Sequence, residues 1–310
     1  MRTVHTAPTG TALAPLTAVA ARALPKTEGY FRGVGRRLLH DKISLAALIV
    51  FLGIVAVSVA APLVNDAVLH QDPNRGVLTR KFRPPSRDHL LGTDDYGRDE
   101  LARLLVAGRV SLGIGALSML ISVTLGVALG VVAAYYGKFV DDSVNALVQT
   151  INNIPTLFLL IMLAVVFRPG VVGLSLIIGL TGWTGTTRLI RGRVLSERRR
   201  DYVDAAIANG ASPPRVMARH ILPNVASLVL LVAGGDVIGA IFAEAGISYL
   251  GFGVQIPTAS WGNMLSKSFD FFEQAPWLVI VPGVMVMLTI LCLFQLTDGL
   301  RDALDPYLKT

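Results

Sequence analysis

Two acidic residues inside an apolar stretch are the first candidates for chemistry in this sequence. Asp236 and Glu244 both lie within the apolar run 225–247. A carboxylate near the centre of a membrane helix costs roughly 2.5 to 3.5 kcal/mol on insertion scales and usually marks a pathway or a paired site. We expect Asp236 to line a water-filled pathway and to hold water or an amine, with pairing to a neighbouring subunit as the alternative. Glu244 is expected to stabilise an outer loop.

No catalytic constellation is recognisable in the chain. It contains no G-x-x-x-x-G-K-S/T loop for nucleotide phosphates, no H-E-x-x-H helix for zinc and no G-x-S-x-G turn for a nucleophile. Four carboxylates that could bind a metal ion lie close together in the sequence: Asp94, Asp95, Asp99 and Glu100. The arginines among them instead favour the start of a helix whose acidic charges are neutralised. We predict no catalytic residue, no metal site and no cofactor held by this chain.

The most specific pattern is a polar island between two apolar segments. Residues 202–224 read YVDAAIANGASPPRVMARHILPN. Ala205 and Ala206 have almost no side chain, so a helix that carries them can approach a partner surface closely. Gly210 permits backbone angles that other residues resist. The pattern predicts two short helices joined at Gly210.

The second of these helices has its own start and stop signals. Ser212 has the type of a helix cap, and Pro213 suits the first turn that follows it. Pro223 lacks the amide hydrogen that a helix interior needs, so we expect it to interrupt this helix.

The island resembles the EAA loop of binding-protein-dependent ABC importer permeases. In that family the loop forms a cytoplasmic helix-turn-helix that docks into a groove of the ATPase subunit and transmits its closure to the membrane helices. The family's usual glutamate is Asp204 here, one methylene shorter. The resemblance implies that six residues couple this chain to an ATPase: Asp204, Ala205, Ala206, Gly210, Ala211 and Arg215.

The elements that position these residues are membrane helices. The composition is 53% hydrophobic and 16% charged, with a mean hydropathy of +0.59, which indicates a polytopic membrane protein. A span needs about 20 mainly apolar residues. Six spans are predicted: 43–64, 110–136, 144–167, 171–187, 225–247 and 277–296. Glycine pairs at helical spacing, Gly126 with Gly130 and Gly235 with Gly239, indicate close helix contacts within the bundle or to a partner subunit.

The distribution of lysine and arginine predicts the orientation. With a cytoplasmic N-terminus, the inner segments hold 18 of the 28 Lys and Arg residues. Most of the others lie in the long loop 65–109, and charges in long loops predict orientation poorly. The island 202–224 therefore faces the cytoplasm, as do both termini. Because this bias explains most of the net charge of +7, no nucleic-acid partner is predicted.

The predicted organisation begins with a loose cytoplasmic extension. Its segments are 1–42 (the extension), 43–64 (the first span), 65–109 (an external loop), 110–300 (a five-helix core with a coupling loop at 197–224) and 301–310 (a cytoplasmic tail). In the external loop, Thr93 or Asp94 is expected to cap an amphipathic helix that leads into the second span. That helix would bear Arg98 and Asp99 on its polar face.

Three further stretches resemble the same family of permeases. They read HLLGTDDYGRDELARLLVAGRVSLGIG at 89–115, FAEAGISYLGFGVQIPTASWGNML at 242–265 and LRDALDP at 300–306. Together with the island, they make the chain similar to the second permease of oligopeptide and dipeptide importers. The resemblance implies an all-α fold of the type I importer class and a place in the bacterial cytoplasmic membrane. It also implies a homologous permease partner, two ATP-binding subunits that carry ATP and Mg²⁺, and an external binding protein.

The outer loop 251–263 is expected to form a re-entrant or gate-like segment, because its glycines and Pro257 forbid a continuous helix. Gln255 and Trp261 are candidate gate residues, with interfacial anchoring as the alternative role of Trp261.

The resemblance implies peptides as cargo, with nickel chelates, glutathione or haem as alternatives. A secondary transporter that uses Asp236 and Glu244 as ion sites is the rival class, and a membrane enzyme is a third. Repeated halves with broken helices would favour the secondary transporter, and none is evident.

Overall fold

The computed structural model describes residues 30–304, and within this range the chain is mostly helical. The longer helices are α2 (Lys42–Val59), α4 (Glu100–Tyr136), α5 (Lys138–Asn152), α6 (Thr156–Phe167), α7 (Val171–Glu197), α10 (Leu222–Tyr249) and α12 (Trp277–Leu304). The shorter ones are α1 (Tyr30–His40), α3 (Ala61–Val64), α8 (Asp201–Ala208), α9 (Pro213–Val216) and α11 (Trp261–Leu265). The remaining turns are the π-helices η3 (Asn65–Leu69) and η5 (Met217–Ile221) and the 3₁₀ helices η4 (Leu78–Arg80) and η6 (Ser268–Phe271). The predicted all-α class is confirmed.

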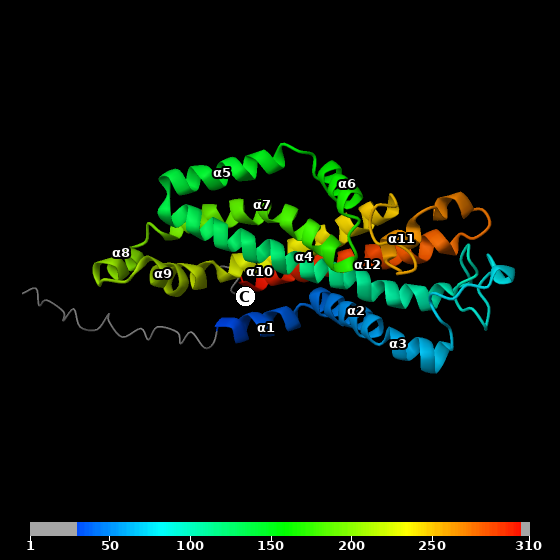
Figure 1. Cartoon of the computed structure of the whole chain (residues 1–310). Helices are drawn as coiled ribbons and strands as arrows, with labels where there is room; N and C mark the ends of the chain where they lie inside the picture. The colour runs from blue at the N-terminus through cyan, green and yellow to red at the C-terminus, as the bar shows by residue number, and fades with distance from the viewer. Residues whose placement is uncertain (1–29, 305–310) are drawn as a thin grey trace, which may run out of the picture.

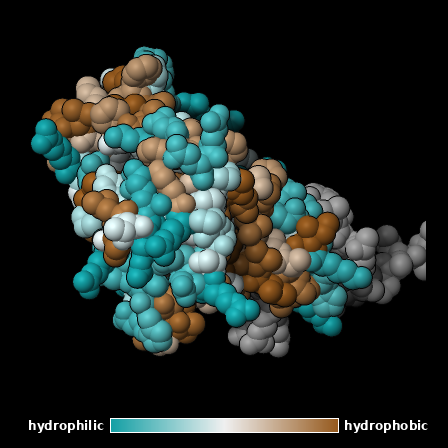
Figure 2. Space-filling model, turned by 90° about the vertical axis from the view of Figure 1, so that its right-hand side faces the viewer, coloured by the Kyte–Doolittle hydropathy of each residue, from teal (hydrophilic) through white to brown (hydrophobic). Residues whose placement is uncertain are grey.

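The long helices lie side by side in an elongated bundle (Figure 1). At one end are α8 and α9, and at the opposite end are the irregular segment that precedes α4 and the loop that contains α11. Viewed from this second end, hydrophilic residues cover much of the centre of the face and hydrophobic residues gather along its flanks (Figure 2).

Four helices among the described residues are long and apolar enough to cross a membrane, or five if a bent pair counts as one span. They are α2, α4, the helix from Pro213 to Tyr249 and α12, with α5 and α6 as the bent pair. The remaining predicted span corresponds to α7, which is 27 residues long. At about 1.5 Å per residue this helix is long enough to cross. Its glycines and threonines make it less apolar than the others.

The predicted span 144–167 is not a single straight helix, because the chain bends by 81° between α5 and α6. Pro155 is the N-cap residue of α6 and has φ −56° and ψ 122°. Proline offers no amide hydrogen to the preceding turn and disfavours helical angles at the residue before it. The helix therefore ends at Asn152 and restarts at Thr156.

The contact between α4 and α7 is the most extensive in the bundle. A Cβ atom on Gly126 would lie 2.6 Å from the Cβ of Thr186, and one on Gly130 would lie 2.9 Å from the carbonyl oxygen of Thr187. Only glycine fits at these two positions, which confirms the predicted contact. Gly235 and Gly239 of α10 have no atom within 4 Å of such a Cβ, so this pair does not pack against any helix between residues 30 and 304.

Part of the expected loose extension is ordered. Residues 30–40 form the amphipathic helix α1, in which Val34 is buried against Ala303 of α12 and Leu38 packs beside it. These two apolar side chains are four residues apart and share one helix face. Asp41 and Lys42, which also belong to the predicted extension, form the cap and the first residue of α2. Residues 1–29 of the predicted extension and 305–310 of the predicted tail lie outside the described residues.

The start of α4 also differs from the prediction. Its cap is Asp99, whose carboxylate accepts a hydrogen bond from the Ala102 amide at 2.8 Å. Thr93 and Asp94 instead hold the turn before the helix, where Asp94 Oδ1 accepts from the amides of Tyr96 and Arg98 at 2.9 Å each. An Asp side chain can accept backbone hydrogen bonds in a tight turn as well as at the start of a helix. The residue type alone therefore did not show whether Asp94 or Asp99 caps α4.

Candidate functional site

The polar island forms a helical hairpin at one end of the bundle. Helix α8 ends in a Schellman motif, in which the Ala211 amide donates to the Ala206 carbonyl at 3.0 Å and the Gly210 amide donates to the Ile207 carbonyl at 2.9 Å. Gly210 has φ +80°, an angle that side chains resist. The turn between α8 and α9 therefore depends on a glycine at this position.

The tip of the hairpin presents a surface of small side chains. Asp204, Ala205, Gly210 and Arg215 are exposed, and Ala206 and Ala211 are half-buried. The six predicted coupling residues therefore lie on the two arms and the turn of a single hairpin. Such a surface allows a partner protein to approach the backbone.

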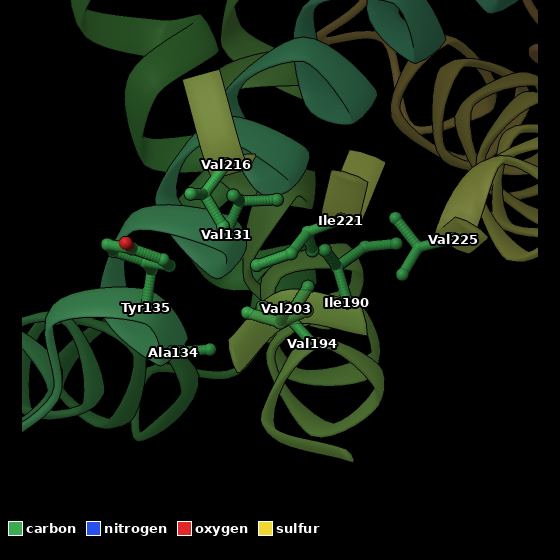
Figure 3. Packing of buried hydrophobic residues seen from close by; sticks show 9 residues of the cluster. All are labelled: Val131, Ala134, Tyr135, Ile190, Val194, Val203, Val216, Ile221 and Val225. Atoms are coloured by element: carbon green, nitrogen blue, oxygen red, sulfur yellow. The ribbon is translucent and has the colours of Figure 1, made fainter. Parts of the chain in front are cut away.

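The base of the hairpin is anchored in a hydrophobic cluster (Figure 3). Val203 of α8 and Val216 of α9 are both fully buried. They pack with seven residues from the ends of the bundle helices and the turn before α10: Val131, Ala134, Tyr135, Ile190, Val194, Ile221 and Val225. Displacement of the hairpin would move α4, α7 and α10 with it, because close-packed clusters transmit strain.

A polar contact holds α8 to the end of α7. The Tyr202 hydroxyl donates to Glu197 Oε2 at 2.9 Å. The Glu197 side chain is buried and also pairs with Arg193 at 2.9 Å and with Arg200 at 3.8 Å. This contact was not predicted, although the sequence shows Glu197 as an acidic residue among basic ones.

The second arm of the hairpin continues into α10, so the predicted interruption at Pro223 is wrong. Ser212 is the N-cap residue of α9 as expected, but its side chain makes no capping hydrogen bond. The π-turn η5 precedes Pro223, which then occupies the first turn of α10. A wider turn relieves the clash that a proline ring makes with the carbonyl four residues earlier.

Asp236 lies where α4, α7 and α10 meet. Its Oδ2 accepts hydrogen bonds from the Ser122 hydroxyl at 2.7 Å and from the Thr186 hydroxyl at 2.9 Å. The residue lines a cavity of about 210 Å³ together with Gly235 and Gly239. The glycines without a helix neighbour therefore border the same space as the carboxylate. The contacts of Ser122 and Thr186 with Asp236 were not predicted from the sequence.

Ser111, Ser118 and Ser122 share one face of α4, at spacings of seven and four residues. A stripe of hydroxyl residues on an apolar helix was a usable signal for the partners of a buried acid. Ser118 donates to the Ser175 carbonyl of α7 at 3.0 Å, so this stripe faces the interior of the bundle.

Glu244 supports the outer loop through two serines. Its carboxylate accepts from Ser111 at 2.8 Å and from Ser248 at 2.7 Å. The Ser248 hydroxyl in turn accepts from the Val254 amide at 3.0 Å, and the Ser111 hydroxyl accepts from the Trp261 amide at 3.1 Å. The buried carboxylate is thus linked through two serines to the backbone of the loop at Val254 and at Trp261.

The two other candidate gate residues differ in exposure. Trp261 is fully buried, and its Nε1 donates to the Leu104 carbonyl at 3.2 Å, so the side chain packs inside the protein and is not exposed on its surface. Gln255 is exposed, and its amide donates to the Gly253 carbonyl at 3.0 Å. The loop that both belong to is non-helical from Gly251 to Ser260, as its glycines and proline predicted.

The fold and the hairpin together define an integral membrane transport subunit, and comparison with known proteins identifies its family. Residues 126–310 match the family of the binding-protein-dependent transport system inner membrane component. The chain belongs to this family. Its members are multi-pass permeases of the inner membrane and not enzymes.

Similar proteins with known names are permeases of peptide importers. The oligopeptide transport system permease protein OppC of Haemophilus influenzae is 34% identical over 273 residues, which cover 87% of this chain and 86% of that protein. The dipeptide transport system permease protein DppC of Bacillus subtilis is 34% identical over 282 residues, covering 90% and 87% respectively. Among solved structures, the inward-facing MetNI methionine ABC transporter matches with a TM-score of 0.52 at 18% identity, covering 65% of this chain and 96% of that one. This last likeness concerns the fold alone.

Proposed function

We propose that this chain forms one half of the translocation pathway of an ATP-driven importer of di- or oligopeptides. The observation that carries this proposal is the hairpin α8–α9, which exposes alanines and a glycine at its tip while Val203 and Val216 anchor its base. A hairpin of this kind is suited to receive a push from another protein and pass it to several bundle helices at once.

We assign the hairpin to the cytoplasmic side, together with both chain termini. The basic residues around the hairpin support this orientation, because cytoplasmic loops carry an excess of Lys and Arg. The partner at the tip would be an ATP-binding subunit, which supplies ATP and Mg²⁺. Nucleotide would drive transport by binding one arrangement of the ATPase pair better than the other.

The assembly would contain a homologous permease, two ATP-binding subunits and an external binding protein that delivers cargo. Peptides are proposed as cargo because the named relatives, at about a third identity over most of their length, are oligopeptide and dipeptide permeases. Asp236 would line the pathway, since its cavity lies among α4, α7 and α10. Its carboxylate suits the amino terminus of a peptide in transit.

At the outer end, the loop 251–263 would act as a gate toward the binding protein. Gln255 is the exposed member, whereas Glu244 and Trp261 form the fixed base on which the loop rests. A loop that opens and closes must be attached to residues that stay in place, so that its open and closed positions are well defined.

The proposal is tested by uptake into vesicles that contain the complete transporter. Uptake of tri-alanine should require ATP and should continue in the presence of an uncoupler. Replacing Ala205 by Trp should abolish both ATP-dependent uptake and association with the ATPase. The matched control is Ala67→Trp, because Ala67 is an exposed alanine at the opposite end of the bundle. This substitution should leave both uptake and association unchanged.

Uptake that survives removal of the ATP-binding subunits and collapses with the uncoupler would overturn the proposal in favour of a gradient-driven transporter. Uptake of nickel chelates, glutathione or haem in place of peptides would correct the cargo and leave the mechanism standing.

A further inference from the structure

An enclosed carboxylate beneath the outer surface has no role in the function proposed above. Glu100 is the first residue of α4, and its side chain is 2% exposed. Its Oε1 has no hydrogen-bond partner among the described residues. Burial of a polar atom without a partner is costly, because the lost hydration is not replaced. The position therefore calls for a donor that the described chain does not supply.

Glu100 lines a cavity of about 240 Å³. Its walls come from the turn 94–98, the start of α4, the loop 251–256, the segment 263–271 and the start of α12. Since liquid water occupies about 30 Å³ per molecule, the cavity holds roughly eight waters. A whole oligopeptide is too large for this volume, whereas the end of a peptide or one long side chain fits.

Three cationic side chains line the cavity, Arg98, Arg103 and Lys267, and no ion pair joins Lys267 to Glu100 within the described residues. The two arginines are engaged elsewhere. Arg98 Nε lies 2.7 Å from Asp94 Oδ2, and Arg103 Nε lies 3.6 Å from the same oxygen. Arg103 also donates to the Pro73 carbonyl at 3.0 Å. Neither guanidinium forms an ion pair with Glu100 within the described part of the chain. Two carboxylates remain as acceptors in the cavity. One is that of Glu100, and the other is that of Asp95, whose ion pair with Arg98 is long, at 4.0 Å.

We propose that this cavity is a binding site for a primary ammonium group, held by Glu100 with Asp95 as its second acceptor. An ammonium carries one positive charge and three hydrogen-bond donors on a compact head. A divalent metal ion fits less well, because it needs several free carboxylate or carbonyl oxygens. Bound at this position, an ammonium would join the start of α4 to the outer loop and to the segment that follows α11.

Two sources would supply an ammonium at this end of the bundle. One is the amino terminus of a cargo peptide, and the other is a lysine side chain of the external binding protein. This inference rests on the proposed function only for its assignment of this end to the outside. Its test therefore measures binding rather than transport.

The test uses the complete transporter in lipid nanodiscs, without ATP, in an Asp236→Asn background so that the pathway carboxylate does not contribute. The first probe is radiolabelled tri-alanine, with N-acetyl-tri-alanine as its uncharged counterpart. Glu100→Gln removes the charge while keeping the size of the side chain. It should weaken binding of tri-alanine about tenfold to a hundredfold, the effect of losing one hydrogen bond to a charged group. The acetylated probe should bind weakly to both proteins.

The second probe is the cargo-free binding protein, untreated or with its lysines acetylated. If Glu100→Gln weakens association of the untreated protein while tri-alanine binding is unchanged, the ammonium comes from the binding protein. Asp95→Asn provides a second variant and should produce a smaller loss with the same probe. Asp88→Asn, an exposed acid of the same loop outside the cavity, is the matched control and should change neither probe.

Equal binding of both probes by the wild-type transporter and Glu100→Gln would overturn the proposal. Equal affinity for free and acetylated tri-alanine, combined with indifference of the binding protein to acetylation, would also overturn it. ATP-dependent uptake, measured on the same proteins with Asp236 restored, reports separately on the proposed transport function.

Discussion

The hydroxyl of Tyr202 donates a hydrogen bond to the buried carboxylate of Glu197, with an oxygen–oxygen distance of 2.9 Å, across the junction of α7 and α8. Burial and this hydrogen bond raise the pKa of Tyr202 to about 12. The hydroxyl therefore remains a donor throughout the physiological pH range. This contact fixes the angle at which the hairpin leaves the bundle.

Removal of that hydroxyl should loosen the coupling of transport to ATP hydrolysis. We expect Tyr202→Phe to lower the free energy of unfolding by about 0.5 to 1.5 kcal/mol, the value of one hydrogen bond. Peptides moved per ATP should fall, while association with the ATPase is retained, because the tip of the hairpin is unchanged. Parallel assays of uptake and of ATP hydrolysis measure this ratio. An unchanged ratio would mean that the Tyr202 contact is not part of the transmission.

The turn at Gly210 should not tolerate a side chain. Its φ of +80° places it in the left-handed region, where a residue with a Cβ costs about 1 to 2 kcal/mol. Gly210→Ala should therefore make the hairpin more sensitive to proteolysis and lower uptake. Gly192→Ala is the control, because Gly192 lies in α7 and has no atom within 4 Å of an added Cβ. Alanine should be neutral or stabilising at that helical position. Equal behaviour of the two variants would refute the role of the turn.

Asp236 should affect cargo movement more than assembly. Asn at this position can still accept the hydrogen bonds of Ser122 and Thr186, so we expect Asp236→Asn to assemble normally. Uptake of tri-alanine should fall about tenfold or more, because the carboxylate charge that faces the cavity is lost. Ser122→Ala leaves the Thr186 bond in place and should have a smaller effect. Unchanged uptake by Asp236→Asn would limit this residue to a packing role.

Glu244 should be important for stability. Glu244→Ala would leave the Ser111 and Ser248 hydroxyls without their acceptor and open a cavity under the outer loop, at a cost of about 3 kcal/mol. Thermal unfolding of the purified chain in detergent measures this loss. Glu273→Ala, an exposed acid at the same end, should change the unfolding temperature little. Similar unfolding temperatures for the two variants would contradict the network that we describe.

The sequence predicts the features that depend on local rules. Apolar runs gave the positions of the helices, and the alanines with Gly210 gave the hairpin and its turn. Features that depend on how neighbouring turns accommodate a proline were not predicted correctly. Pro155 breaks a helix and Pro223 begins one, and the difference lies in the π-turn that precedes Pro223.

Contacts between segments that are distant in the sequence were also not predicted. Asp236 and Glu244 were recognisable as unusual residues, but their partners Ser122, Thr186 and Ser111 lie 50 to 133 positions away in the chain. Helix pairing decides which hydroxyl meets which carboxylate, and one sequence does not determine that pairing. Glu100 was assigned to a neutralised helix start for the same reason, since the arginines near it in sequence turn toward Asp94 instead.

The most direct test of the central claim is a cross-link from the hairpin tip. Cys292 is the only cysteine of the chain and is buried, so Cys292→Ser provides a background for a single new thiol in Ala205→Cys. We predict that this thiol reacts with a membrane-impermeant maleimide only from the cytoplasmic side. It should also form a cross-link to the ATP-binding subunit in the assembled transporter. Labelling from the outside, or a transporter that imports peptides without any such cross-link, would contradict the account.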